Sequence, residues 1–291
     1  MILVTGASGT VGRPVLEAVI KTGKPVKAMY RRAEDARNAP AGVATVIADF
    51  ADKAAMARAL QGIDTVYLVC SPIPELVKLE SNAIEASKQA GVRHIVLNSA
   101  LGAGDYPKSF PSWHFKVEEA LKTSSLGYTI LRPGGFLQNI TTYYVPLIRA
   151  QNAFYASMGT AKVSLIDVRD VAGVAAKALA APGEHTGKTY ELKGPEALTC
   201  SEIAQRISRV AGRRVQYVDV PEDALRKSMQ DTGAPEWLVN AELDLEAYYR
   251  MERKSAEVDD VLENLLGRAP IRLDQFLMET KENYRSAAAG A

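Results

Sequence analysis

The stretch that decides the fold is MILVTGASGTVG, Met1–Gly12, and a helical pattern over 14–20 follows it directly. A short apolar run, a glycine turn and a helix start, in that order, are the context in which such glycines indicate a dinucleotide site. Gly6 allows the tight turn, Gly9 lets the backbone approach a pyrophosphate, and Gly12 lets the helix pack closely on the strand. The helix N-terminus supplies N–H groups and positive dipole for the phosphates.

The turn is therefore predicted to contact a cofactor, and the alternative is a glycine-rich turn without a ligand. The predicted contact residues in it are Gly6, Ser8, Gly9, Thr10, Val11 and Gly12. Because the pattern begins at Ile2, we expect the nucleotide-binding fold to start the chain, with no signal peptide before it.

Composition excludes several classes of protein. With 291 residues, 47% hydrophobic and 24% charged, the chain is predicted to form one large globular domain or two closely joined ones. A net charge of +1 argues against direct nucleic-acid binding, and no apolar stretch is long enough to span a membrane. Cys70 and Cys200 are expected to be free thiols of a cytoplasmic protein. His94, His114 and His185 lack metal-ligand spacing, so no metal is expected.

Apolar runs alternate with helical patterns through the first half of the chain. Runs of this kind, separated by helices, indicate a parallel sheet covered on both faces. The predicted fold class is a doubly wound α/β (Rossmann) sheet with a smaller, mostly helical C-terminal portion. The predicted strands are 2–4, 26–30, 43–48, 64–70, 94–99 and 128–131, and the intervening helices include 51–60, 75–90 and 112–124.

The rhythm changes after residue 135. A strand at 163–166, a helix at 168–180 and a strand at 189–192 are expected to add to the same sheet, and helices then follow at 201–211, 235–253, 258–266 and 273–284. We therefore expect an NAD(P)-binding domain over 1–135, with 160–195 adding to its sheet. A substrate-binding portion is expected over 136–159 and 196–285, and a flexible tail over 286–291.

Charge after the second strand indicates which nucleotide is bound. NAD-binding units carry an acid about 20 residues past the glycines, but this chain has Arg31 there. A guanidinium can bind a 2′-phosphate that a carboxylate would repel, so NADP(H) is preferred and NAD(H) is the alternative. The alternative is that Arg31 and Arg32 are two solvated surface arginines. Asp49 and Phe50 suit an adenine edge; alternatively, Asp49 or Asp52 caps the next helix.

Several motifs of the chain occur together in one family. They are Val4–Gly12, Arg31, Asp49–Phe50, Leu131–Asn139, Ile166–Ala172 and Tyr190–Pro195. In combination they resemble the NmrA-like branch of the atypical short-chain dehydrogenases/reductases. The resemblance implies NADPH-dependent reduction of quinones, azo dyes or triphenylmethane dyes, or alternatively NAD(P) sensing without turnover, as in the regulatory NmrA proteins. It does not fix a substrate.

The wider superfamily reduces carbonyls with a Tyr-x-x-x-Lys pair and a nearby serine. Ser99 and Lys116 are the counterparts that the resemblance implies, but Ser112 stands where the tyrosine would be. A ketone needs a positioned acid for its developing alkoxide. A quinone develops a phenolate-like oxygen with a pKa of about 10 and can manage without one. The missing tyrosine thus favours a conjugated acceptor, and it is equally compatible with no reaction.

The remaining predicted contacts surround the expected nicotinamide. Lys116 would hold the ribose, Ser99 or Asn98 would bond near the ring, and His114 could donate a proton. For each of these roles the alternative is that the residue is an ordinary surface or packing residue. Further cofactor contacts are predicted from Cys70, Ser71, Pro72, Pro133, Gly134 and Phe136. The predicted acceptor-binding residues, for which core packing is the alternative, are Trp113, Phe136, Asn139, Tyr143, Tyr144, Phe154 and Met158.

The leading hypothesis is therefore a cytoplasmic NADPH-dependent reductase of a small conjugated acceptor. The alternative is an NAD(P)-sensing regulator that acts through a protein partner. A homodimer is left open, and a sugar-nucleotide epimerase is disfavoured because Ser112 cannot supply the proton donor.

Overall fold

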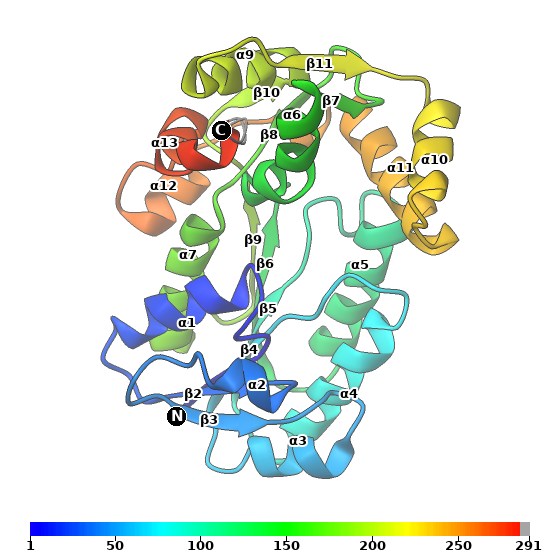
Figure 1. Cartoon of the computed structure of the whole chain (residues 1–291). Helices are drawn as coiled ribbons and strands as arrows, with labels where there is room; N and C mark the ends of the chain where they lie inside the picture. The colour runs from blue at the N-terminus through cyan, green and yellow to red at the C-terminus, as the bar shows by residue number, and fades with distance from the viewer. Residues whose placement is uncertain (286–291) are drawn as a thin grey trace. The chain divides into compact units, whose positions relative to one another are not determined.

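The computed structural model describes residues 1–285, and the chain divides into two compact units (Figure 1). Unit 1 consists of Met1–Pro133 and Val168–Leu192, and unit 2 of Gly134–Asp167 and the described chain from Lys193 onward. The chain therefore passes from one unit to the other three times. The tail predicted at 286–291 lies outside the described residues.

Unit 1 is built on a seven-stranded parallel sheet of order β3-β2-β1-β4-β5-β6-β9. Every residue of β4 and β5 is buried, as expected of strands covered on both faces. The predicted doubly wound α/β fold is confirmed. The strands are β1 (Ile2–Val4), β2 (Val26–Tyr30), β3 (Ala44–Ile47), β4 (Thr65–Leu68), β5 (His94–Asn98), β6 (Gly127–Pro133) and β9 (Lys188–Leu192).

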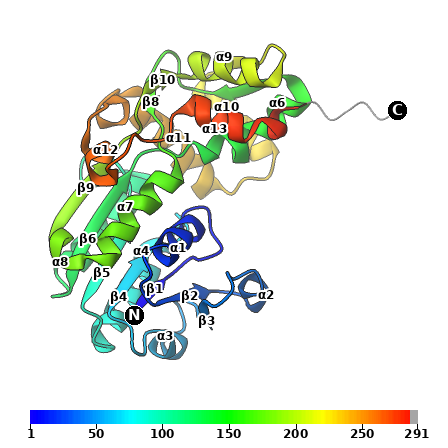
Figure 2. The ribbon, with the colours of Figure 1, turned by 90° about the vertical axis from the view of Figure 1, so that its left-hand side faces the viewer.

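Helices cover both faces of this sheet. On one face α1 packs against α7, and on the other α4 packs against α3 and α5 (Figures 1 and 2). The apolar core under α3–α5 joins Leu68 and Leu97 of the sheet to Met56, Leu76 and Leu121 of these helices. The helices of unit 1 are α1 (Gly12–Ile20), α2 (Ala33–Ala36), α3 (Lys53–Ala59), α4 (Leu76–Gln89), α5 (Ser109–Lys122), α7 (Val168–Ala180) and α8 (Pro182–His185).

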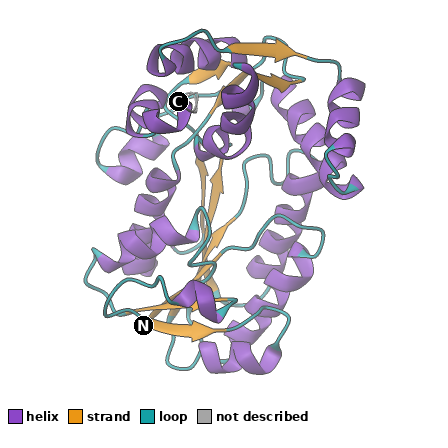
Figure 3. Ribbon diagram, in the orientation of Figure 1, coloured by secondary structure: helices purple, strands orange, loops and turns teal. Residues whose placement is uncertain are grey.

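Unit 2 is mostly helical, with two short sheets (Figure 3). Strand β8 (Lys162–Ser164) pairs antiparallel with β10 (Ala197–Thr199), and β7 (Ala153–Ala156) pairs parallel with β11 (Gln216–Asp219). The helices are η1 (Ile140–Tyr144), α6 (Val145–Gln151), α9 (Cys200–Ala211), α10 (Glu222–Asp231), α11 (Glu236–Arg250), η2 (Lys254–Ala256), α12 (Val261–Leu266), α13 (Leu273–Glu279) and η3 (Lys281–Tyr284).

Local signals explain where these helices begin and end. Thr199 and Glu202 form a reciprocal capping box at the start of α9, and Gly212 ends it in the left-handed conformation. Asp52 caps α3 by accepting hydrogen bonds from the Ala54 and Ala55 amides. Of the two predicted caps, Asp52 therefore is the one that α3 uses. The predicted helix at 273–284 is divided into α13 and η3.

The prediction that 163–166 joins the main sheet is wrong. Only β9 joins it, whereas β8 pairs with β10 inside unit 2. The observed strand has three residues, of which only Val163 is apolar, and this is too little pattern to specify its partner edge. The backbone of Gly194, also in unit 2, packs closely on this segment: its amide donates to the Ser164 carbonyl at 3.3 Å, and a Cβ on Gly194 would lie 1.9 Å from the Leu165 carbonyl oxygen. The predicted range 160–195 is thus divided between the two units.

Candidate functional site

The glycine turn leaves β1 and leads into α1 at the carboxyl edge of the unit 1 sheet. Thr5 anchors it to β4: the Thr5 hydroxyl donates to the Tyr67 carbonyl at 3.0 Å and accepts from the Val69 amide at 3.0 Å. The Gly9 amide closes the turn on the Gly6 carbonyl at 2.8 Å. No side chain caps the N-terminus of α1, and its first turn carries no acid. Amides at this helix end are therefore available to an anion.

Each glycine of the turn is present for a different physical reason. Gly6 has a φ of +58°, where a side chain would be strained. A Cβ on Gly12 would lie 2.1 Å from the Gly6 carbonyl oxygen, so only glycine lets α1 approach the turn. At Gly9 the corresponding distance is 3.2 Å, a tight contact that small adjustments could relieve. Gly9, with Ser8 and Thr10, is exposed at the rim of the turn, where a ligand phosphate would lie.

Arg31 and Arg32 follow β2 but differ in their surroundings. Arg32 donates to Asp35 through Nε and Nη2 at 2.9 and 3.0 Å. Arg31 is exposed and forms no ion pair with any residue between 1 and 285. The structure therefore leaves Arg31, and not Arg32, available for an added anion.

Asp49 and Phe50 follow β3, next to β2 in the sheet. Asp49 accepts a hydrogen bond from the Ala51 amide at 2.8 Å and is partly exposed. The ring of Phe50 belongs to the apolar core and is only 9% exposed. Of the predicted adenine contacts, Asp49 is therefore the better placed.

Cys70, Ser71 and Pro72 follow β4, with Cys70 half-buried and the other two exposed. Burial and the Glu80 carboxyl raise the pKa of the Cys70 thiol to about 12. Cys70 therefore stays a thiol at neutral pH, which fits a structural contact and not a nucleophile. Glu80 itself is fully buried on α4, and its pKa is raised to about 8 by the loss of hydration.

The segments that follow β1, β2, β3 and β4 all begin at one edge of the sheet, because parallel strands have their carboxyl ends at the same edge. The strand order reverses between β1 and β4, and crevices at such a switch point are where α/β sheets bind ligands. A glycine turn in which Gly12 has no room for a Cβ, an uncapped helix end and an unpaired guanidinium at Arg31 fit the diphosphate and the 2′-phosphate of a dinucleotide. The residues present thus fit the predicted cofactor.

A buried polar network on β5, α5 and β6 was not predicted from sequence. The Ser99 hydroxyl donates to Glu118 at 2.6 Å, and Arg132 donates to both carboxylate oxygens of Glu118 at 2.8 and 2.6 Å. Glu118 is fully buried. Its position four residues after His114, on the buried stripe of α5, was the available signal, because charged residues rarely occupy core positions unpaired.

The network changes what the predicted catalytic residues can do. The Ser99 proton is given to Glu118, and Asn98 accepts from the Tyr67 hydroxyl at 3.0 Å. Burial lowers the pKa of His114 to about 4, against a smaller opposing effect of Glu118, so this histidine is neutral at physiological pH. A neutral, buried imidazole is poorly suited to the predicted role of proton donor.

Lys116 and Trp113 lie on α5 beside this network. Lys116 is exposed and forms no ion pair within the described chain, so its ammonium is available to a ligand. Trp113 is half-buried, meets Phe110 edge-on at 5.4 Å and packs against the apolar core. Trp113 therefore serves packing at least in part.

The predicted contacts after β6 fall into two groups. Pro133 is buried at the end of β6, where its carbonyl accepts from the Leu101 amide at 2.9 Å. Gly134, Phe136 and Asn139 follow in unit 2 and are each partly exposed. Tyr143 is 60% exposed.

Phe154 and Met158 belong to the core of unit 2, and Tyr144 is partly buried against that core. Phe154 is fully buried and Met158 is 4% exposed. Tyr144 stacks on Phe154 with ring centroids 4.4 Å apart. For Met158 and Phe154 the packing interpretation therefore accounts for the whole side chain.

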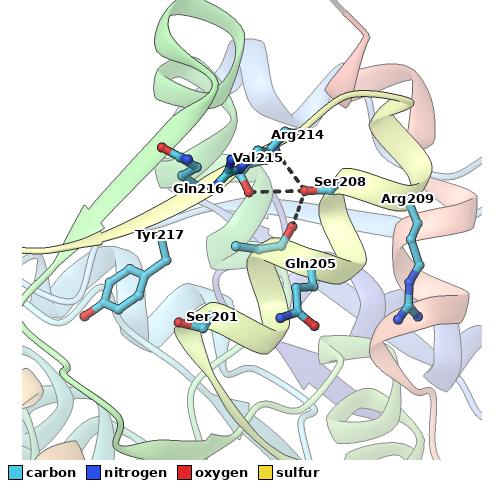
Figure 4. A pocket seen from close by; sticks show the side chains of 9 residues that line it. Ser201, Gln205, Ser208, Arg209, Arg214, Val215, Gln216 and Tyr217 are labelled. Carbon is cyan, nitrogen blue, oxygen red and sulfur yellow. Dashed lines mark hydrogen bonds between the residues drawn. The ribbon is translucent and has the colours of Figure 1, made fainter.

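An open polar groove of unit 2 contains none of the predicted site residues. It lies along α9 and β11 and is lined by Ser201, Ala204, Gln205, Ser208, Arg209, Arg214, Val215, Gln216 and Tyr217 (Figure 4). The Ser208 hydroxyl donates to the Ala204 carbonyl at 2.8 Å and accepts from the Val215 amide at 2.8 Å. The groove thus lies where Ser208 of α9 is hydrogen-bonded to Val215, the residue before β11.

Within residues 1–285, no group of three His, Cys, Asp or Glu side chains could hold a metal ion. Over the same residues, the helices are all too short or too polar to cross a membrane.

Comparison with known proteins identifies the family. The NAD(P)H azoreductase of Xenophilus azovorans is 37% identical over 249 residues, 85% of this chain and 86% of that protein. Quinone oxidoreductase 2 of Escherichia coli (strain K12) is 31% identical over 244 residues, 82% of this chain and 85% of the other. The crystal structure of an Escherichia coli NADPH-dependent quinone oxidoreductase complexed with NADPH matches with a TM-score of 0.88 at 28% identity, over 96% of this chain and 99% of that one. Residues 1–282 match the NmrA-like family, and the chain therefore belongs to it, as its motifs predicted.

Proposed function

We propose that this protein is an oxidoreductase that uses NADPH to reduce a small conjugated acceptor, a quinone or an azo compound. The observation that carries the proposal is the uncapped N-terminus of α1 inside the Gly6–Gly12 cradle, at the switch point of the sheet. The names of the azoreductase and quinone oxidoreductase relatives support the same class of reaction.

In this proposal unit 1 binds the dinucleotide. The turn amides from Gly6 to Gly12 hold the diphosphate, Arg31 holds the 2′-phosphate, and Asp49 accepts from the adenine amino group. Lys116 holds the ribose next to the nicotinamide. Further contacts from unit 1 come from Cys70, Ser71, Pro72, Ser99 and Pro133, and the predicted contacts Gly134 and Phe136 follow Pro133 along the chain. A bound reduced nicotinamide supplies a hydride.

None of the predicted catalytic side chains of unit 1 is a suitable proton donor, and this bears on the class of acceptor. Ser112 stands in place of the superfamily tyrosine, His114 is neutral, and the Ser99 proton is committed to Glu118. A quinone places the incoming electron pair on a weakly basic oxygen and is compatible with these side chains of unit 1, whereas a simple ketone would need a positioned acid that they do not supply. Partly exposed Phe136, Asn139, Tyr143 and Tyr144 of unit 2 provide aromatic and amide surface for such a flat molecule.

The proposal is tested by following NADPH oxidation with a panel of quinones and azo dyes. Turnover that depends on both the acceptor and the protein is expected. The alternative is a nucleotide sensor without turnover, which the missing tyrosine also favours. Tight NADPH binding without turnover of any acceptor would favour that alternative and contradict the reductase.

The NADPH preference has its own test in Arg31→Ala. Removing a charge-assisted contact to phosphate costs about 1.5–3 kcal/mol, so NADPH affinity is expected to fall about 10- to 100-fold. NADH affinity should change little, as measured by calorimetric titration of each nucleotide. Arg32→Ala is the matched control, since Asp35 already engages that guanidinium. Equal losses for the two nucleotides would mean that Arg31 does not contact the 2′-phosphate.

A further inference from the structure

Helix α11 of unit 2 carries two carboxyl groups and a phenol on one stripe. Glu242, Glu246 and Tyr249 are spaced by four and three residues, the spacing that brings side chains to one helix face. All three are partly buried. The Ser157 amide donates to Glu246 at 2.9 Å and fixes that carboxyl in place. Two carboxyl groups and a phenol are thus gathered on one side of this helix.

The Tyr249 hydroxyl lies against the backbone that follows β6. A Cβ built on Gly135 would be 2.7 Å from this oxygen and 3.0 Å from Leu165 Cδ2. Gly135 is the second residue after Pro133, the last residue of β6. Glycine at 135 therefore makes room for the phenol beside the segment Gly134–Phe136, from which the proposed cofactor and acceptor contacts come.

The phenol is neutral and its proton is uncommitted. Tyr249 donates no hydrogen bond to any residue of the described chain. Burial raises the pKa of Tyr249 well above its usual value, and the carboxyls of Glu242 and Glu246 and the Tyr248 phenol raise it further. Tyr249 therefore carries its proton throughout the neutral pH range.

We propose that Tyr249 is a catalytic residue that gives its hydroxyl proton to the reduced acceptor, in place of the tyrosine missing at 112. This inference rests on the proposed function, because it needs an acceptor reduced by a nicotinamide hydride.

The chemistry decides which acceptors need this proton. When an azo compound accepts a hydride at one nitrogen, the N=N π pair moves to the other nitrogen, which must form an N–H bond. Tyr249 supplies that proton, and the phenolate regains one from water, so each turnover consumes one hydride and one proton. A nitrogen anion is far more basic than a phenolate, so the transfer is downhill. A cationic triarylmethyl dye becomes neutral on accepting a hydride and needs no proton.

The test is Tyr249→Phe, which keeps the ring and removes only the hydroxyl. With NADPH and an azo dye, kcat is expected to fall about 100-fold, the usual contribution of a positioned general acid. With NADPH and a cationic triarylmethyl dye, kcat should stay within a factor of about two, because no proton is transferred. The NADPH dissociation constant and the melting temperature, measured alongside, should match those of the unaltered protein.

Two further variants make the result decisive. Tyr248→Phe removes the hydroxyl of the buried neighbouring residue and should leave both activities unchanged. Gly135→Ala keeps the phenol but displaces it, and should lower azo reduction selectively. The same loss with both dyes, or no loss with the azo dye, would overturn the assignment. An unaltered protein that reduces quinones but no azo dye would overturn this inference alone, whereas one that oxidises NADPH with no quinone and no dye would overturn the reductase proposal as well.

Discussion

Gly12→Ala is expected to abolish dinucleotide binding and to lower the free energy of unfolding by about 3 kcal/mol. The added methyl would lie 2.1 Å from the Gly6 carbonyl oxygen and 2.9 Å from that of Thr5. Both neighbours are backbone atoms, so α1 must move away from the turn. The turn amides would then no longer converge on the diphosphate. Calorimetric titration with NADPH and urea denaturation measure the two effects.

Gly183→Ala is the matched control in the same unit. Nothing lies within 4 Å of a Cβ at Gly183, so its stability should change by less than about 0.5 kcal/mol. Cofactor affinity should be unchanged. If Gly12→Ala retained NADPH affinity, the glycine turn would not be the binding site, and the functional proposal would lose its main support.

Glu118→Ala is expected to lower the free energy of unfolding by about 3–5 kcal/mol. It removes both acceptors of the Arg132 guanidinium, whose side chain is only 14% exposed, together with the acceptor of the Ser99 hydroxyl. Glu191, whose carboxylate lies 3.6 Å from the Arg132 guanidinium, is at the limit of an ion pair and cannot replace two short hydrogen bonds. Urea denaturation of the variant and of the unaltered protein gives the difference.

The neighbouring Glu119 provides the comparison. It pairs with Lys122 at 2.9 Å but is 52% exposed, so Glu119→Ala should cost no more than about 1 kcal/mol. The double variant Glu118→Ala with Arg132→Met should cost less than Glu118→Ala alone, because no charge is left buried. Similar effects of Glu118→Ala and Glu119→Ala would show that burial of the ion pair does not determine its contribution.

The parts of the fold that sequence predicted are those with strong local signals. The strand at 26–30 and the helix at 168–180 appear with those bounds in β2 and α7, because long, strongly patterned segments leave little choice of structure. The predicted helix at 112–124 begins earlier, at Ser109, since Pro111 is tolerated in a first helical turn.

In the candidate site, too, the residues that could be predicted are those with local sequence signals. The glycine turn could be predicted because its signal lies within one strand–turn–helix unit. Arg31 could be predicted because it directly follows the next strand, β2. The states of Ser99 and His114 could not, because they depend on Glu118 and Arg132, which only the tertiary structure brings to them. Tyr249 meets Gly135 from a helix far along the chain, so no local motif could indicate that contact.

The strand order has a consequence for how the nascent chain folds. Strand β6 is complete at Pro133, but its outer neighbour β9 ends only at Leu192, after the Gly134–Asp167 segment of the other unit has been synthesised. Until then β6 is an edge strand whose amides and carbonyls can pair with another polypeptide. At the translation rates of cells this interval lasts several seconds. Ribosome-bound chains that end before Leu192 should therefore recruit chaperones more strongly than chains that extend beyond it.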